Sequence, residues 1–392
     1  MASETQFRSQ VRHWLQGHVP AGWRESMTEA TTEAFIAQQR AWMKTLVGAG
    51  FATSHWSKEW PGGGRSLAEQ IIIAEEMARA DAPRLLLYFI SLYHAAMTLM
   101  EWGTEEQKSR HLPAILRGEI WCQGFSEPNA GSDLASLRTR AERHGDHYVV
   151  NGQKIWSTLG QYADYCLLLV RTDSTGPKQA GITYLLMDTR SEGIVRRPIR
   201  QMTGDEEFAE IFLQDVKIPV ANRLGEENAG WRIAQTTLTS ERGLTILELC
   251  ERLHCARWRL LAAMGEKDGI VRDDQFRREA VDVFVKIDAL RALVGDMMVK
   301  LMAGQDLAGS ASFVKLLYAR VLREFAALGE RAGGGSHLLS GFTLGGGYET
   351  GNWAFDFMNS YQWTIAGGSN EVQRNIVAER VLGMPREKWH AT

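Results

Sequence analysis

The chain has 392 residues, of which 44% are hydrophobic and 23% charged, a composition typical of a folded globular protein with room for two or three packed units. Its 44 lysines and arginines stand against 47 acidic residues, and the resulting net charge of -3 gives no electrostatic footprint for DNA or RNA, so we expect no nucleic-acid partner. The longest apolar run, residues 85–93, is far shorter than the roughly 20 residues of a membrane-spanning helix, so we expect a cytoplasmic protein without membrane insertion.

The first 120 residues show helical patterns and are predicted to form an N-terminal helical domain. The clearest pieces are LAEQIIIAEEMARA, residues 67–80, and TEEQKSRHLPAIL, residues 104–116. Thr104 and Gln107 stand three positions apart, as in a capping box at the start of a helix.

Residues 121–228 change to short β-rich runs separated by Gly, Asp and Pro. This is the pattern of a compact antiparallel barrel or sandwich, and it predicts a middle β domain. The runs are HYVVNG, DYCLLLVR, GITYLLMD, IVRRPI and AEIFLQDV.

From residue 229 helical periodicity returns and predicts a C-terminal helical domain over residues 229–392. One apolar stripe follows three- and four-residue steps, as on the buried face of a bundle helix, and such a bundle could bury further surface against copies of itself. The order helices, strands, helices places the chain in the α+β class. The stripe comprises Phe276, Ala280, Val283, Ile287, Leu290, Val294, Met297 and Leu301.

Several common kinds of site are not indicated. Cys122, Cys166, Cys250 and Cys255 form no CxxC pair and stand at no familiar zinc spacing, so we expect buried free thiols and no metal. The sequence also lacks the GxxxxGK[ST], GxSxG and HExxH motifs of phosphate-binding loops, serine hydrolases and zinc proteases.

The segment WCQGFSEPNAGSD, residues 121–133, is a candidate anion site. It places Ser126, Asn129, Gly131 and Ser132 on an expected loop, whose N–H groups and hydroxyls could wrap a pyrophosphate. By itself such a loop is more often only a solvated turn.

The segment YVVNGQKIWSTLGQYAD, residues 148–164, is a second candidate. It places Trp156, Ser157 and Thr158 at a strand end, where one aromatic face and two hydroxyls suit a flat heteroaromatic ring with hydrogen-bonding nitrogens. The alternative is a tryptophan that simply packs in the core.

Together, FSEPNAGSD and NGQKIWST resemble the paired signatures of the acyl-CoA dehydrogenase family of flavoproteins. Other segments are similar to family segments and stand in family order, so the resemblance covers nearly the whole chain. They are GTEEQKSRHLPAILRGE, DVKIP, GEENAGW and NEVQRNIVAERVLG.

The resemblance implies a helical N-terminal domain, a middle β-barrel and a C-terminal four-helix bundle. The assembly would be a homodimer or homotetramer, or a heterotetramer with a homologue. The resemblance further implies bound FAD, an acyl-CoA thioester as substrate, and an electron-transferring flavoprotein as the electron acceptor.

The family motifs also imply roles for residues of the two segments. Gln123, Ser126 and Ser132 would line the flavin and its pyrophosphate, with Ser132 also near the CoA arm. Trp156 would pack beside the isoalloxazine ring with Ser157 next to it in the chain. Thr158 would hydrogen-bond the N5 edge of the ring.

Flavin sites in this family are shared across a dimer, which implies that LGGGYE and GSNE serve the flavin of the neighbouring subunit. The family's Gln before Phe-Gly-Gly is not evident in LLSGFTLGGG, and its cross-subunit arginine is only approximated by RDDQFRR. The candidate residues are Arg272, Gly345, Gly346, Ser369 and Glu371 for the flavin and Gly368 for the substrate.

The reaction that the resemblance implies is α,β-dehydrogenation to the 2-enoyl-CoA. A carboxylate removes the α-proton, and the β-hydrogen passes as hydride to flavin N5. The α-proton is a weak acid, so the base must be desolvated and the thioester carbonyl polarised by fixed donors. In much of the family the base is a Glu in Tyr-Glu-Gly-Thr, but Gly367 occupies that position here, and only its backbone N–H can serve, as a donor to the carbonyl.

Some family members place this Glu on an early helix of the C-terminal domain, next to an arginine. The segment TLTSERGL, residues 237–244, fits that pattern, so Glu241 is the predicted base, and Arg242 would shape the site or support the CoA arm. Without the family pattern, the better explanation of Glu241 is a solvent-facing helix glutamate paired with a nearby arginine. The glycine at 367 favours a bulky or branched acyl group, as in fatty acid or steroid side-chain catabolism.

Two other functions stay open at this point. One is a flavin monooxygenase or oxidase on the same fold, and the other is a partner subunit of a heteromeric acyl-CoA dehydrogenase. The SERG segment favours dehydrogenation, and the intact SEPNAGSD and WST segments favour FAD binding in this chain.

Overall fold

The described residues form two compact units, one helical and one built around a β-sheet. The helical unit combines Met1–Ala30, Ser66–Arg84 and Arg242–Thr392, and the β unit combines Thr31–Arg65 and Leu85–Glu241. The computed structural model describes residues 2–27, 30–239, 243–265, 273–305, 307, 309–333 and 352–385.

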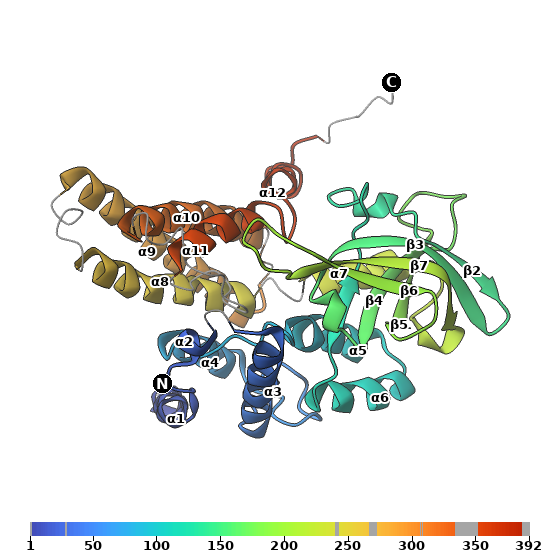
Figure 1. Cartoon of the computed structure of the whole chain (residues 1–392), viewed down its shortest axis with the longest axis horizontal. Helices are drawn as coiled ribbons and strands as arrows, with labels where there is room; N and C mark the ends of the chain where they lie inside the picture. Colours follow the sequence, from blue (N-terminus) through green and yellow to red (C-terminus); the bar gives the residue numbers. More distant parts are fainter. Residues whose placement is uncertain are drawn as a thin grey trace. The chain divides into compact units, whose positions relative to one another are not determined.

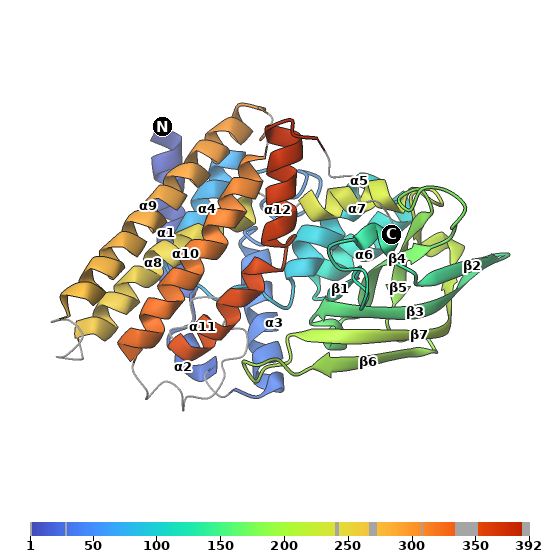
Figure 2. The ribbon, with the colours of Figure 1, turned by 90° about the horizontal axis from the view of Figure 1, so that it is seen from above.

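Long helices that share one apolar core build the helical unit. The helices α8, α9 and α10 lie side by side (Figure 2), and Trp353 of α11 completes their core. The predicted stripe of α9 faces this core from Phe276 to Met297, and Leu301 packs against it half-buried. The elements are α1 (Ala2–His18), α2 (Trp23–Met27), α4 (Leu67–Arg79), α8 (Leu244–Gly265), α9 (Asp274–Met302), α10 (Ser310–Gly333), α11 (Trp353–Ser360), η7 (Tyr361–Thr364), α12 (Asn370–Ile376) and η8 (Val377–Val381).

An eight-stranded sheet forms the centre of the β unit (Figure 1), in the order β6-β7-β3-β2-β4-β5-β8, with β1 added beside β4. Its strands are β1 (Trp121–Gly124), β2 (Arg140–His144), β3 (His147–Thr158), β4 (Tyr165–Arg171), β5 (Ile182–Asp188), β6 (Ile194–Ile199), β7 (Phe208–Pro219) and β8 (Arg223–Leu224). Its helices are α3 (Thr32–Gly48), α5 (Ala96–Trp102), α6 (Glu105–Leu116), α7 (Gly230–Thr239) and the short η1 (Ile90–Ala95), η2 (Leu134–Ser136), η3 (Gly160–Tyr162) and η4 (Val220–Asn222).

The local predictions agree well with these elements. The five predicted β-rich runs become β3 to β7, and the capping box before α6 is present, with Thr104 and Gln107 each bonding the backbone N–H of the other. The expectation of purely antiparallel pairing is wrong where β2 meets β4, which pair parallel at Arg140 and Arg171, and for β1, which pairs parallel to β4 along its length. This pairing joins strands more than 40 residues apart in sequence, so turn signals between neighbouring runs could not indicate it.

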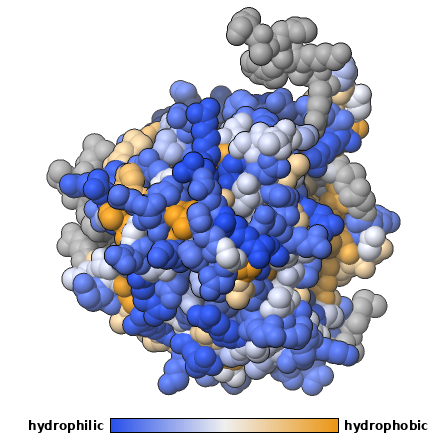
Figure 3. Space-filling view, turned by 90° about the vertical axis from the view of Figure 1, so that its right-hand side faces the viewer, coloured by the Kyte–Doolittle hydropathy of each residue, from blue (hydrophilic) through white to orange (hydrophobic). Residues whose placement is uncertain are grey.

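The surface and the cysteines complete the description. Hydrophilic residues predominate on the face of the molecule in Figure 3. Within the described ranges, no helix combines the length and apolar composition that crossing a bilayer requires. Cys122, Cys166 and Cys250 are buried free thiols as expected, and Cys255 is half-buried.

Candidate functional site

A buried ion pair anchors the loop that carries the first candidate segment. The loop follows β1, and its Glu127 carboxylate lies 2.8 Å from the ammonium of Lys154 on β3. Lys154 is fully buried and also donates to the Phe125 carbonyl at 3.1 Å. The same carboxylate accepts the backbone N–H groups of Arg138 and Thr139 at 2.6 and 2.8 Å. One carboxylate therefore ties the loop to β3 and to the residues that lead into β2.

Burial acts differently on the two charges of this pair. For Glu127, burial alone would raise the pKa, but the Lys154 charge and the hydrogen-bond donors outweigh it and hold the pKa below its ordinary value. For Lys154, burial lowers the pKa, and the attraction of Glu127 opposes that shift. The carboxylate is thus kept charged, and removing the ammonium would leave it buried without its partner.

The second candidate segment ends in a distorted strand that pushes a tryptophan outward. The register between β3 and β7 shifts between Lys154 and Ser157, and Trp156 inside the shift has a left-handed φ of 62°. Trp156 is 55% exposed, and its ring lies edge-on to the ring of Phe208, with 5.9 Å between the two ring centroids. The alternative of a core tryptophan is therefore wrong. A left-handed bulky residue costs on the order of 1–3 kcal/mol and is typical of functional sites.

Next to this tryptophan lies a buried hydroxyl. Ser157 is fully buried, and within the described part of the chain its Oγ has no hydrogen-bond partner. Thr158 follows half-buried at the end of β3, opposite Phe208 of β7. A buried hydroxyl without a partner is uncommon in folded proteins and indicates a missing ligand or solvent contact.

The structure brings the two candidate segments together at the centre of the β unit. The Ile155 N–H donates to the Ser126 carbonyl at 3.0 Å, which places the loop beside the strand residue that precedes Trp156. Gln123 on β1 lies in the same segment, and its Nε2 is 2.6 Å from Nδ1 of His94. His94 belongs to η1, a short π-helical turn, and such turns are frequent at functional sites.

The far end of the loop is open to solvent. Ser132 is exposed, and the neighbouring Asp133 forms an exposed ion pair with Lys178 at 2.5 Å. This contact lowers the pKa of Asp133 through the hydrogen bond from Lys178. The loop is thus held at both ends while its Ser132 tip stays accessible.

The remaining described candidates lie in the helical unit, in the loop before α12. Gly367 and Gly368 both have left-handed φ angles, of 65° and 84°. Gly367 is exposed, and a Cβ atom added there would meet no atom within 4 Å. Ser369 caps α12 by accepting the Val372 N–H at 3.3 Å.

Glu371 lies in the first turn of α12. It is exposed and pairs with Arg374 at 3.3 Å. This position suits a helix N-terminal acid, where a negative charge is favourable. The contact of Glu371 and Ser369 with a flavin stays a prediction.

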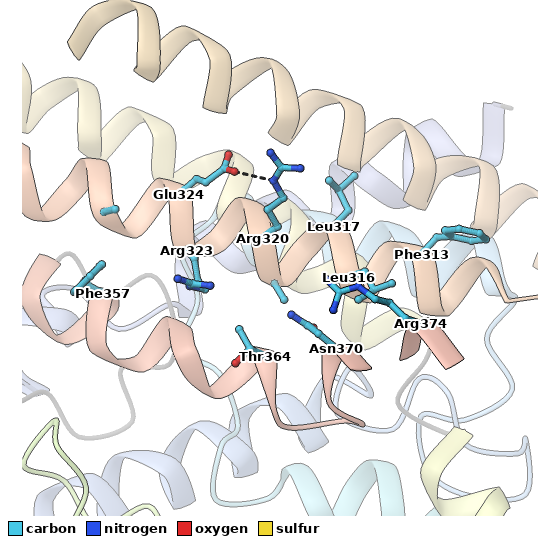
Figure 4. Close-up of a pocket in the computed structure, with 12 residues that line it drawn as sticks. Phe313, Leu316, Leu317, Arg320, Arg323, Glu324, Phe357, Thr364, Asn370 and Arg374 are labelled. Atoms are coloured by element: carbon cyan, nitrogen blue, oxygen red, sulfur yellow. Dashed lines mark hydrogen bonds and ion pairs between the residues drawn. The ribbon is translucent and has the colours of Figure 1, made fainter. Parts of the chain in front are cut away.

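A pocket with a volume of about 610 Å³ lies in the same unit between α10, α11 and α12 (Figure 4). The pocket is surrounded by Arg320, Arg323, Arg374 and Asn370. The Arg320 guanidinium donates to the Glu324 carboxylate. None of the predicted site residues lines this pocket.

Several predicted site residues fall outside the described part of the chain. They are the predicted base Glu241, its neighbour Arg242, and the cross-dimer candidates Arg272, Gly345 and Gly346.

Sequence reasoning missed the pair Glu127 and Lys154, although both lie inside the candidate segments. The available signal was the alternation of β3, in which Tyr148, Val150 and Lys154 occupy buried positions of one strand. A lysine on the buried face of a strand requires an anionic partner, and Glu127 is the acid of the neighbouring motif.

Known proteins match nearly the whole length of the chain. Residues 1–119, 122–216 and 228–382 match the N-terminal, middle and C-terminal domains of acyl-CoA dehydrogenases. The chain is 37% identical to acyl-CoA dehydrogenase IpdE1 of Mycolicibacterium smegmatis over 99% of both chains. Two solved structures, the Tcur3481-Tcur3483 steroid ACAD and the ChsE4-ChsE5 complex from Mycobacterium tuberculosis, are each 30% identical over 99% of both chains, with TM-scores of 0.83 and 0.81.

Proposed function

The chain belongs to the acyl-CoA dehydrogenase family, and from this premise we propose that it uses FAD to oxidise a bulky acyl-CoA thioester, with Glu241 as the base. It is an acyl-CoA dehydrogenase, a flavoprotein oxidoreductase. The observation that carries the cofactor proposal is the exposed, left-handed Trp156 next to the buried hydroxyl of Ser157.

The residues of the β unit fit a flavin. Trp156 offers an exposed aromatic face, and Ser157 offers a buried hydroxyl that no described residue uses. Thr158 would donate its hydroxyl to the edge of the ring, and the loop with Ser126 and Ser132 would hold the diphosphate. Bound FAD would accept the β-hydrogen of the substrate as hydride.

The remaining chemistry belongs to the chain itself. Glu241 would take the α-proton, and the Gly367 N–H would donate to the thioester carbonyl, where negative charge develops as that proton leaves. Gly367 needs no side chain for this role. Its open surroundings support the proposal that the acyl group is bulky.

The hydroxyl of Ser157 provides a test of the flavin site. We expect Ser157→Ala to raise the dissociation constant for FAD about tenfold, the loss of one hydrogen bond, because the hydroxyl is paired only when ligand is bound. The melting temperature of the FAD-free protein should stay unchanged or rise slightly, since a buried hydroxyl without a partner is removed. Fluorescence titration with FAD and thermal unfolding measure the two effects.

The exposed Ser174→Ala serves as the matched control and should change neither quantity. A lower melting temperature of the FAD-free Ser157→Ala protein together with unchanged FAD affinity would show that the hydroxyl is purely structural.

The acyl group is tested by a thioester screen. When the FAD-loaded protein is mixed with thioesters under anaerobic conditions, we expect branched or ring-bearing acyl-CoA thioesters to bleach the flavin absorbance at least tenfold faster than butyryl-CoA. The steroid ACAD among the similar structures supports including steroid-derived thioesters. Faster bleaching by butyryl-CoA would contradict the proposal of a bulky substrate. A monooxygenase would be favoured by two results together: no thioester bleaches the flavin, and the reduced flavin forms a stable adduct with oxygen.

We further propose that the active form is an oligomer, of identical copies or with a homologue, and that an electron-transferring flavoprotein accepts the electrons. Support for assembly comes from apolar side chains exposed on α9, where Val281, Val285 and Val299 are each about 60% exposed. The ChsE4-ChsE5 complex supports a heteromeric form. Light scattering and the FAD content of the chain purified alone would distinguish the two assemblies.

A further inference from the structure

A buried lysine binds the loop that precedes α12. Lys315 on α10 is 8% exposed, and its Nζ donates to the Gly368 carbonyl at 2.7 Å and to Asn370 Oδ1 at 3.1 Å. Burial lowers the pKa of Lys315 to about 8, and the charge of Glu371 acts in the opposite direction. The side chain therefore remains mostly protonated at pH 7 and donates as an ammonium, which makes stronger hydrogen bonds than a neutral amine.

A second buried side chain holds the preceding carbonyl. Gln373 of α12 is 3% exposed, and its Nε2 donates to the Gly367 carbonyl at 2.7 Å. Two successive carbonyls, those of Gly367 and Gly368, are thus each bound by a donor from a different helix. A Cβ on Gly368 would come within 2.7 Å of the Gln373 amide nitrogen, so a side chain there would push this donor away from the Gly367 carbonyl.

The backbone held by Lys315 and Gln373 consists of two glycines, which can adopt many other conformations. Gly367 and Gly368 both lie in the left-handed region, and glycine moves easily between this region and others. Among the described residues, no backbone carbonyl accepts the Gly367 N–H. A flexible pair of glycines would present this donor in many directions, whereas a donor acts well in catalysis only when its direction is fixed beforehand.

We propose that Lys315 is a positioning residue, which fixes the Gly367–Gly368 backbone through the Gly368 carbonyl so that the Gly367 N–H stays directed at the thioester carbonyl. This inference rests on the proposed function of Gly367. Lys315 itself touches neither the substrate nor the flavin in this proposal. Its effect is to keep the donor in place during α-proton removal.

The test compares Lys315→Met, which keeps the length of the side chain but has no donor, with the FAD-loaded wild-type protein. We expect kcat to fall about 10- to 100-fold, because a misdirected donor loses much of the 10²- to 10³-fold effect of such a group, while KM changes less than about threefold. Lys315→Gln retains an N–H donor and should recover part of kcat, and it serves as the second variant if Lys315→Met does not fold.

A measurement without turnover separates positioning from a structural role. The probe is the 3-oxoacyl-CoA analogue of the thioester that bleaches the flavin fastest, since polarising its thioester carbonyl favours the enolate, which is visible by ultraviolet absorbance. We expect Lys315→Met to bind this analogue with an affinity within about threefold of wild type, but with an apparent pKa of the bound analogue raised by about one unit, a tenfold loss of enolate stabilisation. The melting temperature and FAD content are recorded alongside.

The matched control is Lys300→Met, which removes a partly exposed lysine of α9 that pairs with Asp296 at 2.6 Å. It should leave kcat and the enolate signal unchanged. A wild-type enolate signal that persists fully in both Lys315 variants would overturn the positioning role. If the wild-type protein itself neither binds nor ionises the analogue, the proposed function of the Gly367 N–H fails instead, so the two failures are distinguishable.

Discussion

Glu241→Gln should leave the protein folded and able to bind FAD, but should lower the rate of anaerobic flavin bleaching by about 10³-fold. Gln has nearly the shape of Glu but cannot take a proton, and a positioned general base contributes about 10²- to 10⁴-fold to a rate. Gly367 has no carboxylate to replace it, because the position used in much of the family is a glycine. Stopped-flow absorbance with the best thioester of the screen measures the rate.

Two further observations make this test specific. Glu241→Gln should still perturb the flavin spectrum on mixing with the thioester, which shows that binding survives. Glu142→Gln, an exposed glutamate of β2 that pairs with Arg140 at 3.2 Å, is the matched control and should bleach at the wild-type rate. Wild-type bleaching by Glu241→Gln would remove this residue from the mechanism.

Lys154→Met should lower the free energy of unfolding of the β unit by about 3–5 kcal/mol, the usual effect of removing one partner of a buried ion pair. The change leaves the Glu127 carboxylate buried and charged, still bound by the N–H groups of Arg138 and Thr139 but without the ammonium of its ion pair. Because Glu127 anchors the loop that contains Ser126, FAD content should fall as well. Urea unfolding at pH 7 and the flavin absorbance of the purified protein measure the two effects.

Two variants of the same loop test the cause. Lys154→Met with Glu127→Gln removes the unpaired charge but keeps an acceptor for the N–H groups, so it should recover about half of the lost free energy of unfolding. Lys178→Met breaks the exposed pair with Asp133 and should cost only about 0–1 kcal/mol. Equal losses for Lys178→Met and Lys154→Met would show that burial of the pair is not what matters.

The pH dependence of the Glu127–Lys154 pair follows from the shifted pKa of Glu127. The pKa of Glu127 in the folded protein lies below its ordinary value of 4.5, despite burial, because of Lys154 and the hydrogen-bond donors. Its contribution to stability is therefore complete above pH 4.5 and is lost as the pH falls through the lower, folded-state pKa. Comparisons at pH 7 lie well inside the range where the pair is charged.

Local structure could be predicted from the sequence because its causes are local. Periodicity located β3 to β7 and the stripe of α9, and a pair of residues three positions apart located the start of α6. The division into compact units depends instead on tertiary packing between helices that lie far apart in sequence. The helices α1 and α4 pack in one unit with α8, whereas α3, α5 and α6 belong to the other, and helical periodicity does not indicate which partner a helix face will meet. The boundaries of the three domains, at residues 120 and 228, stay a prediction.

The sequence by itself determined the family, the two flavin segments and the absence of a carboxylate at Gly367, because these are properties of residue identity and order. Only the tertiary structure decided that Trp156 faces outward, that Lys154 meets Glu127 from 27 positions away, and that Lys315 meets the Gly368 carbonyl from 53 positions away. A buried charge must find its partner wherever the fold brings one within hydrogen-bonding distance, and sequence spacing carries no record of that encounter.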